Sequence, residues 1–174
     1  MIIIAGAGIG GLTLGCALSR AGRPFRILER AAELRPVGAG IALSENALRA
    51  LAHIGLAEAG RAAGQEFGTA AICDQQGKVL IGYRIRDIIS GATVAMARAA
   101  LQQTLVEALG AHVHTGQEVV DYEHLATGVR VRLASGETVE VTCWLAPTGS
   151  TRQWGASCEV KSRFDTAAIR AGVR

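Results

Sequence analysis

The 174-residue sequence predicts an α/β fold, and three features of its first thirty residues support this prediction. Residues 2–5 (IIIA) are apolar and mostly β-branched, which is typical of a strand buried on both faces of a parallel sheet. A glycine-rich turn follows, and residues 12–21 then have the pattern of a helix that ends at Gly22. Residues 24–28 resemble a second strand. This order of strand, helix and strand predicts a parallel βαβ unit.

The composition supports a globular chain and excludes several other classes. The hydrophobic fraction of 49% and the charged fraction of 19% exclude a disordered chain. The net charge is +3, with no run of Lys or Arg, so we expect no nucleic-acid partner. The uncharged first nineteen residues could suggest a signal peptide or a membrane span. They lack a cationic start and are rich in glycine, so we expect neither.

The spacing of the cysteines and histidines does not predict a metal site. The four cysteines, at positions 16, 73, 143 and 158, form no CxxC pair, which predicts reduced thiols and a cytoplasmic location. His112 and His114 would share one face of a strand, but no carboxylate stands at ligand spacing from them. We therefore expect no bound metal.

The turn after the first strand, residues 6–11 (GAGIGG), contains the pattern G-x-G-x-x-G. Gly6 permits a tight turn, Gly8 lets the backbone approach a pyrophosphate, and Gly11 lets the helix pack closely on the sheet. The amides at the helix start attract phosphate. Glu29 follows Gly11 by 18 residues, where a carboxylate accepts the ribose hydroxyls. Together these features predict a dinucleotide site. Glu29 would repel a 2′-phosphate, so NADP is disfavoured there, while NAD and FAD both remain open.

The remaining elements are predicted from periodicity and turn residues. Ser44 should cap a helix that runs to about residue 53 and ends at Gly55. Residues 67–74 and 79–85 should form a hairpin, and residues 113–115, 117–122, 128–133 and 137–141 further strands. A helix should begin at Arg98, with Leu101, Leu105 and Leu109 on its buried face.

Four segments, in the same order and spacing, resemble the class A FAD-dependent monooxygenases, the flavoprotein aromatic hydroxylases. They are IIIAGAGIGGLTLGCALSRAG, ILER, VGAGIALSENALRALAHIGL and TVAMARAALQQTLVEALG, and the resemblance covers residues 1 to about 140. It implies a Rossmann-like, three-layer FAD/NAD(P)-binding domain over residues 1–141, within which residues 67–95 begin the β-sheet of a substrate domain. It also implies FAD as cofactor, NAD(P)H as co-substrate, and O₂-dependent hydroxylation of a small aromatic.

The resemblance also implies which residues hold FAD. For Arg98, the residues alone favour a solvated arginine at a helix start, whereas the resemblance places it and Gln102 against the flavin's ribityl and phosphate groups. Many relatives have His before this arginine, where this chain has Ala97. No residue qualifies as a catalytic base. The expected FAD contacts are Gly6, Gly8, Ile9, Gly10, Gly11, Glu29, Arg30, Gly40, Arg98, Gln102 and Val119.

The chain departs from the family after residue 141. Relatives continue with a segment close to DLLVGADGIHSAV, whereas this chain has TCWLAPTGSTRQW, with Thr148-Gly149 in the place of Asp-Gly. Codons for TCWLAPTGSTRQW, read one base out of frame, can encode DLLVGADGIHSAV. Our hypothesis is therefore that residues 142–174 are a frameshifted, divergent tail of a truncated monooxygenase. The gene's nucleotide sequence tests this. Two alternatives stay open: an NAD-dependent oxidoreductase, and a non-catalytic dinucleotide-binding remnant.

Overall fold

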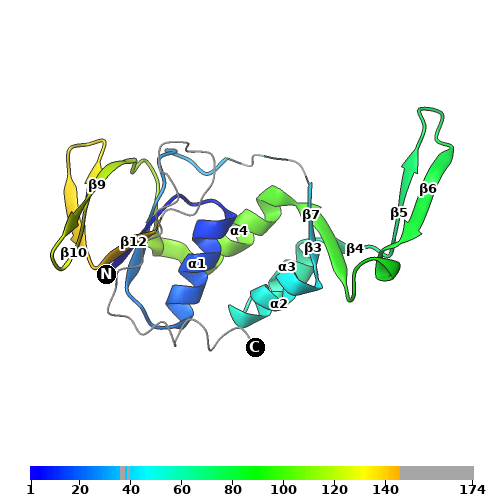
Figure 1. Cartoon of the computed structure of the whole chain (residues 1–174), viewed down its shortest axis with the longest axis horizontal. Helices are drawn as coiled ribbons and strands as arrows, with labels where there is room; N and C mark the ends of the chain where they lie inside the picture. The colour runs from blue at the N-terminus through cyan, green and yellow to red at the C-terminus, as the bar shows by residue number, and fades with distance from the viewer. Residues whose placement is uncertain (36–37, 39, 146–174) are drawn as a thin grey trace.

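The computed structural model describes residues 1–35, 38 and 40–145 of the chain. Its centre is a parallel four-stranded sheet in the order β12-β1-β2-β8 (Figure 1). These strands are β1 (Ile2–Ala5), β2 (Phe25–Leu28), β8 (Val113–His114) and β12 (Cys143–Leu145). Every neighbouring pair is parallel, as the βαβ pattern predicts.

Two helices cover one face of this sheet. They are α1 (Ile9–Arg20) and α4 (Arg98–Leu109), and they share a buried cluster with the sheet. Leu101, Leu105 and Leu109 all lie in it, so the predicted buried face of α4 is confirmed. Side chains alternate along β1, so that Ile4 packs under the helices and Ile3 belongs to a second cluster on the opposite face.

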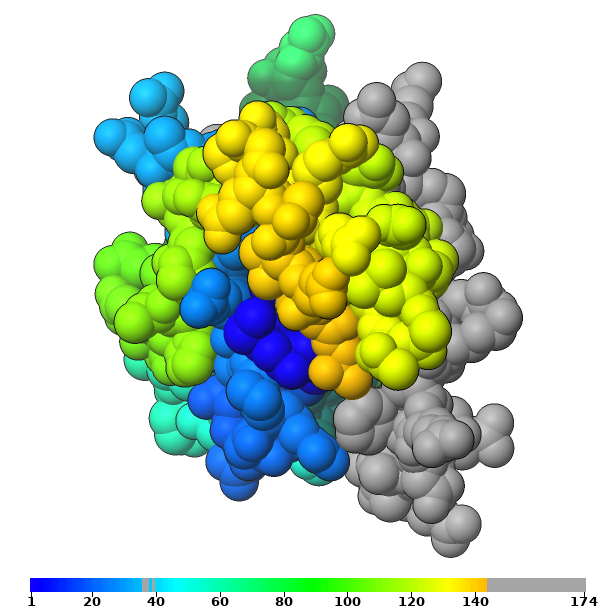
Figure 2. Space-filling view, turned by 90° about the vertical axis from the view of Figure 1, so that its left-hand side faces the viewer, coloured from blue at the N-terminus to red at the C-terminus, as the bar shows by residue number. Residues whose placement is uncertain are grey.

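A three-stranded antiparallel sheet covers that opposite face. It consists of β9 (Val119–Leu125), β10 (Gly128–Leu133) and β11 (Thr138–Val141), in the order β11-β10-β9. Val131, which is fully buried, packs in the cluster of Ile3 and Leu28. Figure 2 shows this sheet, yellow to gold, lying over the dark blue N-terminal strand. The layers are therefore helices, parallel sheet and antiparallel sheet, and the predicted three-layer α/β architecture is confirmed.

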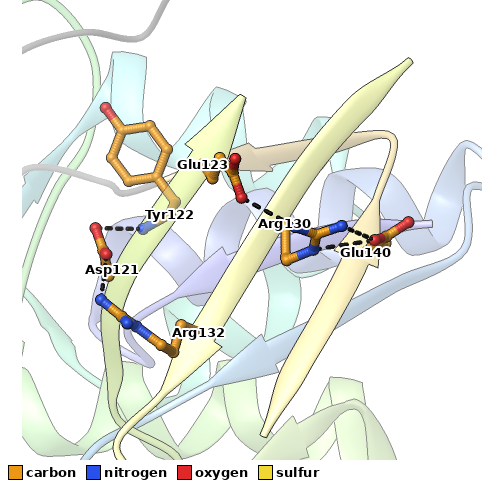
Figure 3. A network of polar contacts seen from close by, with 6 residues as sticks. All are labelled: Asp121, Tyr122, Glu123, Arg130, Arg132 and Glu140. Atoms are coloured by element: carbon orange, nitrogen blue, oxygen red, sulfur yellow. Dashed lines mark hydrogen bonds and ion pairs between the residues drawn. The ribbon is translucent and has the colours of Figure 1, made fainter. Parts of the chain in front are cut away.

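The outer face of the antiparallel sheet carries cross-strand ion pairs (Figure 3). Arg130 on β10 donates to Glu123 on β9 at 3.0 Å and to Glu140 on β11 at 2.6 Å. Arg132 pairs with Asp121 in the same way. The hydrogen bond and charge of Glu140 raise the pKa of Arg130 above its ordinary value. Each of these partners stands directly opposite in the strand register, so the charges favour this register over a slipped one.

A second antiparallel sheet, in the order β3-β7-β4, continues the main core. Its strands are β3 (Gly40–Ser44), β4 (Gln65–Glu66) and β7 (Thr93–Ala97), and the helices α2 (Glu45–His53) and α3 (Ala57–Ala62) pack beside it. Leu43, Val94 and Met96 join Leu48 and Leu51 of α2 in the cluster that also contains α1 and α4. One continuous hydrophobic core therefore connects the two sheets.

The remaining strands form a hairpin that projects from this end of the molecule (Figure 1). Among the described residues, strands β5 (Thr69–Cys73) and β6 (Val79–Arg84) pair only with each other, and a short 3-10 helix, η1 (Ile85–Asp87), follows. The predicted hairpin is confirmed. It is separate from β7, which pairs with β3 and β4. That residues 67–95 begin a substrate-domain sheet stays a prediction.

Several boundaries differ from the sequence-based expectation. Helix α1 begins at Ile9 rather than residue 12, because Gly8 is its N-cap and the amide of Leu12 already donates to the Gly8 carbonyl at 3.0 Å. Ser44 does occupy the N-cap position of α2, but its hydroxyl donates to Asn46 Oδ1 instead of accepting from a backbone amide. Strands β3, β4 and β7 and helix α3 were not predicted. All four are short, and the three strands pair with segments that are distant in the sequence.

The segment after residue 141 is described only as far as residue 145. There β12 pairs in parallel with β1, with Cys143 opposite Ile2. The expected divergence and the Thr148-Gly149 substitution otherwise lie outside the described residues. Within the described part, no helix is long and apolar enough to cross a membrane, and α1, which begins in the uncharged N-terminal stretch, has 12 residues.

Candidate functional site

A cleft of about 540 Å³ opens at the carboxyl ends of β1 and β2. Ligands of open parallel sheets bind at this edge, because the turns into the helices leave backbone amides facing outward there. The cleft brings together three regions of the chain: the glycine turn, the segment after β2, and the start of α4. Its lining residues are Ala7, Gly8, Glu29, Ala31, Ala32, Glu33, Leu34, Arg35, Arg98 and Gln102.

The three glycines of the motif have different structural roles. Gly6 has a φ of +106°, a left-handed conformation that favours glycine. A Cβ on Gly11 would lie 2.1 Å from the Gly6 carbonyl oxygen, so only glycine lets the first turn of α1 pass this close to the turn. A Cβ on Gly8 would meet no protein atom within 4 Å, although Gly8 lines the cleft. Gly6 and Gly11 are thus required by the fold, whereas the space beside Gly8 is open to a ligand.

Glu29 lies just after β2, and its carboxylate joins two parts of the cleft wall. One oxygen accepts a hydrogen bond from the amide of Ala7 at 2.8 Å, and the other from the amide of Ala31 at 2.9 Å. A carboxylate oxygen can accept more than one hydrogen bond, so both oxygens can also accept from a hydroxyl in the cleft. Glu29 therefore fixes the glycine turn and presents acceptor atoms beside it.

The start of α4 supplies the opposite wall. Gln102, one turn into the helix, donates from Nε2 to the carbonyl of Ala7 at 2.8 Å. Arg98, the first residue of α4, is half-buried, and a Cβ on Gly38 would lie 3.1 Å from its Cδ. The backbone at Gly38, where φ is +108°, thus passes close to the arginine stem. Ala7 is held from both sides, by Glu29 at its amide and by Gln102 at its carbonyl.

This set of groups fits the ADP end of a dinucleotide cofactor. The first amides of α1 have no partner within the helix and attract phosphate, and Arg98 adds a cation on the same cleft. The carboxylate of Glu29 suits the two hydroxyls of a ribose and opposes a 2′-phosphate. The open volume beside Gly8 is where a pyrophosphate can approach the backbone.

The structure gathers some of the expected contact residues and leaves others apart. Gly8, Glu29, Arg98 and Gln102 line one cleft, and Gly6 and Gly11 shape its turn. Ile9 packs against the main hydrophobic cluster, and Gly10 is exposed in the first turn of α1. Their contact with FAD stays a prediction.

Three further residues expected to contact FAD do not line this cleft. Arg30 is exposed, Gly40 begins β3 opposite Ala97, and Val119 packs in the second cluster behind the central sheet. Contact between these residues and FAD also stays a prediction. Conversely, no motif pointed to the segment after Glu29, residues 31–35, which forms much of the cleft wall.

The histidines are placed elsewhere. His112 lies in the 3-10 helix η2 (Gly110–His112) rather than on a strand, and its ring stacks on Phe25 with centroids 4.5 Å apart. It is therefore a packing residue, not a partner of His114 on one strand face. No group of three or more potential metal ligands occurs in the described residues.

The family described as FAD binding domain matches residues 1–145 of the chain. The chain belongs to this family. Aurachin C monooxygenase/isomerase of Stigmatella aurantiaca is 38% identical over 139 residues, and 3-hydroxybenzoate 6-hydroxylase 1 of Aquipseudomonas alcaligenes is 35% identical over 147 residues. These alignments cover 78% and 79% of this chain, but 36% and 37% of the relatives.

A solved structure shows the same fold with the cofactor in place. Klebsiella pneumoniae HpxO, complexed with FAD and uric acid, superposes with a TM-score of 0.72 and 25% identity, covering 83% of this chain and 38% of that one. The resemblance to class A FAD-dependent monooxygenases is thereby confirmed, and FAD is the cofactor of the family. The chain spans little more than a third of the length of these relatives.

Proposed function

We propose that this chain is the FAD-binding part of an FAD-dependent monooxygenase that hydroxylates a small aromatic compound with NAD(P)H and O₂. One observation carries the proposal: Gly8, Glu29, Arg98 and Gln102, from three distant segments, line a single cleft at the carboxyl end of the parallel sheet. The family membership and the names of the relatives support the same activity. With free thiols at Cys16 and Cys73, we expect the protein in the cytoplasm.

In this proposal the chain's residues bind and orient the cofactor. Glu29 accepts hydrogen bonds from the adenosine ribose, the first amides of α1 donate to the pyrophosphate, and Arg98 offsets phosphate charge. Gln102 and Glu29 hold Ala7 on both sides, which keeps the glycine turn in its binding conformation before the ligand arrives. FAD, when bound, supplies the redox chemistry that couples NAD(P)H to O₂.

The activity of the whole protein is a separate part of the proposal. The sequence offers no residue that qualifies as a catalytic base, so we expect little NADH oxidation with candidate aromatics by this chain alone. Turnover at a kcat on the order of 1 s⁻¹ or more would contradict that expectation.

Cofactor titration of the purified chain tests the binding function. Visible absorbance reports retained flavin, and fluorescence titrations with FAD and with NADH measure the two affinities. We expect saturable FAD binding that is at least tenfold tighter than NADH binding. A colourless protein that binds NADH in preference would instead support an NAD-dependent oxidoreductase. A colourless aggregate would support a non-catalytic dinucleotide-binding remnant.

A further inference from the structure

The cleft at the glycine turn carries charges of both signs. Among the described residues that line it, the charged groups are the carboxylates of Glu29 and Glu33 and the guanidinium groups of Arg35 and Arg98. The pyrophosphate of FAD is a dianion, and a bound anion that leaves water must be compensated by cations or hydrogen-bond donors. Arg98 supplies one cation. Arg35, to which no role has yet been given, is the second cation on the cleft wall.

Arg35 lies on the same side of the cleft as Arg98. It ends the wall segment of residues 31–35, and it lines the cleft together with Gly8 and Arg98. Three residues farther along the chain, a Cβ on Gly38 would lie 3.1 Å from the Cδ of Arg98. Three residues of chain span at most about 11 Å. The backbone of Arg35 therefore lies near the stem of Arg98, and the two side chains can reach the same pyrophosphate.

In the structure, Arg35 forms an ion pair with Glu33. The Nε atom of Arg35 lies 3.7 Å from Oε2 of Glu33, which is too long for a hydrogen bond. The two side chains are 80% and 75% exposed, and exposed pairs of this kind contribute little. Hydrogen bonds between arginine and phosphate, in contrast, are charge-assisted and frequently bidentate. Arg35 can therefore exchange Glu33 for a phosphate at small cost.

We propose that Arg35 is a phosphate-binding residue that changes partner, from Glu33 in the free protein to the pyrophosphate of FAD in the complex. Glu33 then competes with the ligand, because its carboxylate holds Arg35 and repels the pyrophosphate. The proposal rests on the proposed function, since FAD must occupy this cleft. It requires neutral substitutions at the two residues to change FAD affinity in opposite directions, which a loss of local structure does not produce.

The test uses the full chain and two matched pairs of variants. Arg35→Gln and Glu33→Gln each remove one charge from the cleft wall. Arg84→Gln and Asp87→Asn are the controls, because this exposed pair also has Nε 3.7 Å from a carboxylate oxygen, and neither residue lines the cleft. Flavin fluorescence titrations at about 0.01 M and 1 M NaCl measure FAD affinity where the Debye length is roughly 30 Å and 3 Å. Circular dichroism verifies that each variant is folded.

At low salt, we expect Arg35→Gln to weaken FAD binding about three- to tenfold and Glu33→Gln to tighten it about two- to fivefold. Both differences should shrink at high salt, because exposed charges are screened there. Arg35→Lys keeps the charge without the bidentate geometry, so it should regain part of the lost affinity. Arg84→Gln and Asp87→Asn should bind FAD as wild type does.

Several results would refute the exchange of partners. Equal FAD affinity of wild type and Arg35→Gln would overturn it while leaving the FAD site itself in place, and so would an unchanged affinity of Glu33→Gln. Weaker binding by both cleft variants would indicate that the ion pair only supports the wall. A loss in Arg84→Gln as large as that in Arg35→Gln would indicate an effect of net charge alone. A folded wild-type chain that binds no FAD would instead refute the proposed function, and the role of Arg35 with it.

Discussion

Alanine substitutions at two glycines of the same motif should have opposite consequences. Gly8 has φ −72° and ψ 172°, which alanine adopts without strain, and a Cβ there meets no protein atom within 4 Å. Gly8→Ala should therefore leave the apoprotein as stable as wild type or more stable, by about 0.4–1 kcal/mol, because alanine restricts the unfolded chain. At Gly11 the added Cβ would lie 2.1 Å from the Gly6 carbonyl oxygen. The backbone must move, which we expect to cost about 1–3 kcal/mol.

FAD binding should show the opposite effect at Gly8: the substitution that leaves the apoprotein stable should weaken the complex with FAD. Its Cβ projects into the cleft where a pyrophosphate would approach the backbone, so Gly8→Ala should weaken FAD binding by at least tenfold, or about 1.4 kcal/mol. Gly68→Ala is the matched control, because a Cβ on Gly68 also meets nothing within 4 Å and Gly68 does not line the cleft.

Chemical denaturation monitored by circular dichroism measures the stability of each apoprotein, and flavin fluorescence titration measures its FAD affinity. The combination expected for Gly8→Ala is unchanged or increased stability with reduced affinity. If Gly8→Ala binds FAD as tightly as Gly68→Ala does, the cleft at the glycine turn is not the pyrophosphate site. If Gly11→Ala is as stable as wild type, the close approach of α1 to the turn is not a constraint on the fold.

Three other substitutions test separate parts of the structure. Glu29→Gln loses one of two carboxylate acceptors, so we expect about 1 kcal/mol lower stability and roughly tenfold weaker FAD binding by titration; unchanged values for both would contradict the role of Glu29. Gly64→Ala places a Cβ 2.6 Å from the Ala95 carbonyl oxygen, which should cost about 1–3 kcal/mol and lower Tm by several degrees in a thermal scan. Burial raises the pKa of Cys16, so above about pH 8.5 the unfolded thiol ionises while the folded one keeps its proton, and stability falls by up to about 1.4 kcal/mol per pH unit. Cys16→Ala should remove that slope in denaturation series at pH 8–10, and an identical slope in both proteins would refute it.

Local sequence was sufficient for the elements that have local causes. The β-branched run of β1, the glycine turn and the leucines of α4 at helical spacing each specify their element within one segment. The hairpin was predicted for the same reason, since its two strands are joined by a turn signal. Glu29 was found by its spacing from Gly11. The start of α1 was misplaced because Gly10 and Gly11 are poor helix formers in isolation. Gly11 is required there by its close approach to Gly6.

By itself, then, the sequence determined the βαβ unit, the dinucleotide motif and the family, because these depend on residue types at short, fixed spacings. Tertiary structure decided which of the expected contacts share a cleft. Gln102 and Glu29 are far apart along the chain and meet only at Ala7, because α4 and β2 pack on either side of the same turn. Pairing between distant segments likewise placed β7 with β3 and β12 with β1. Such contacts depend on where a whole element packs, and residue spacing does not record that.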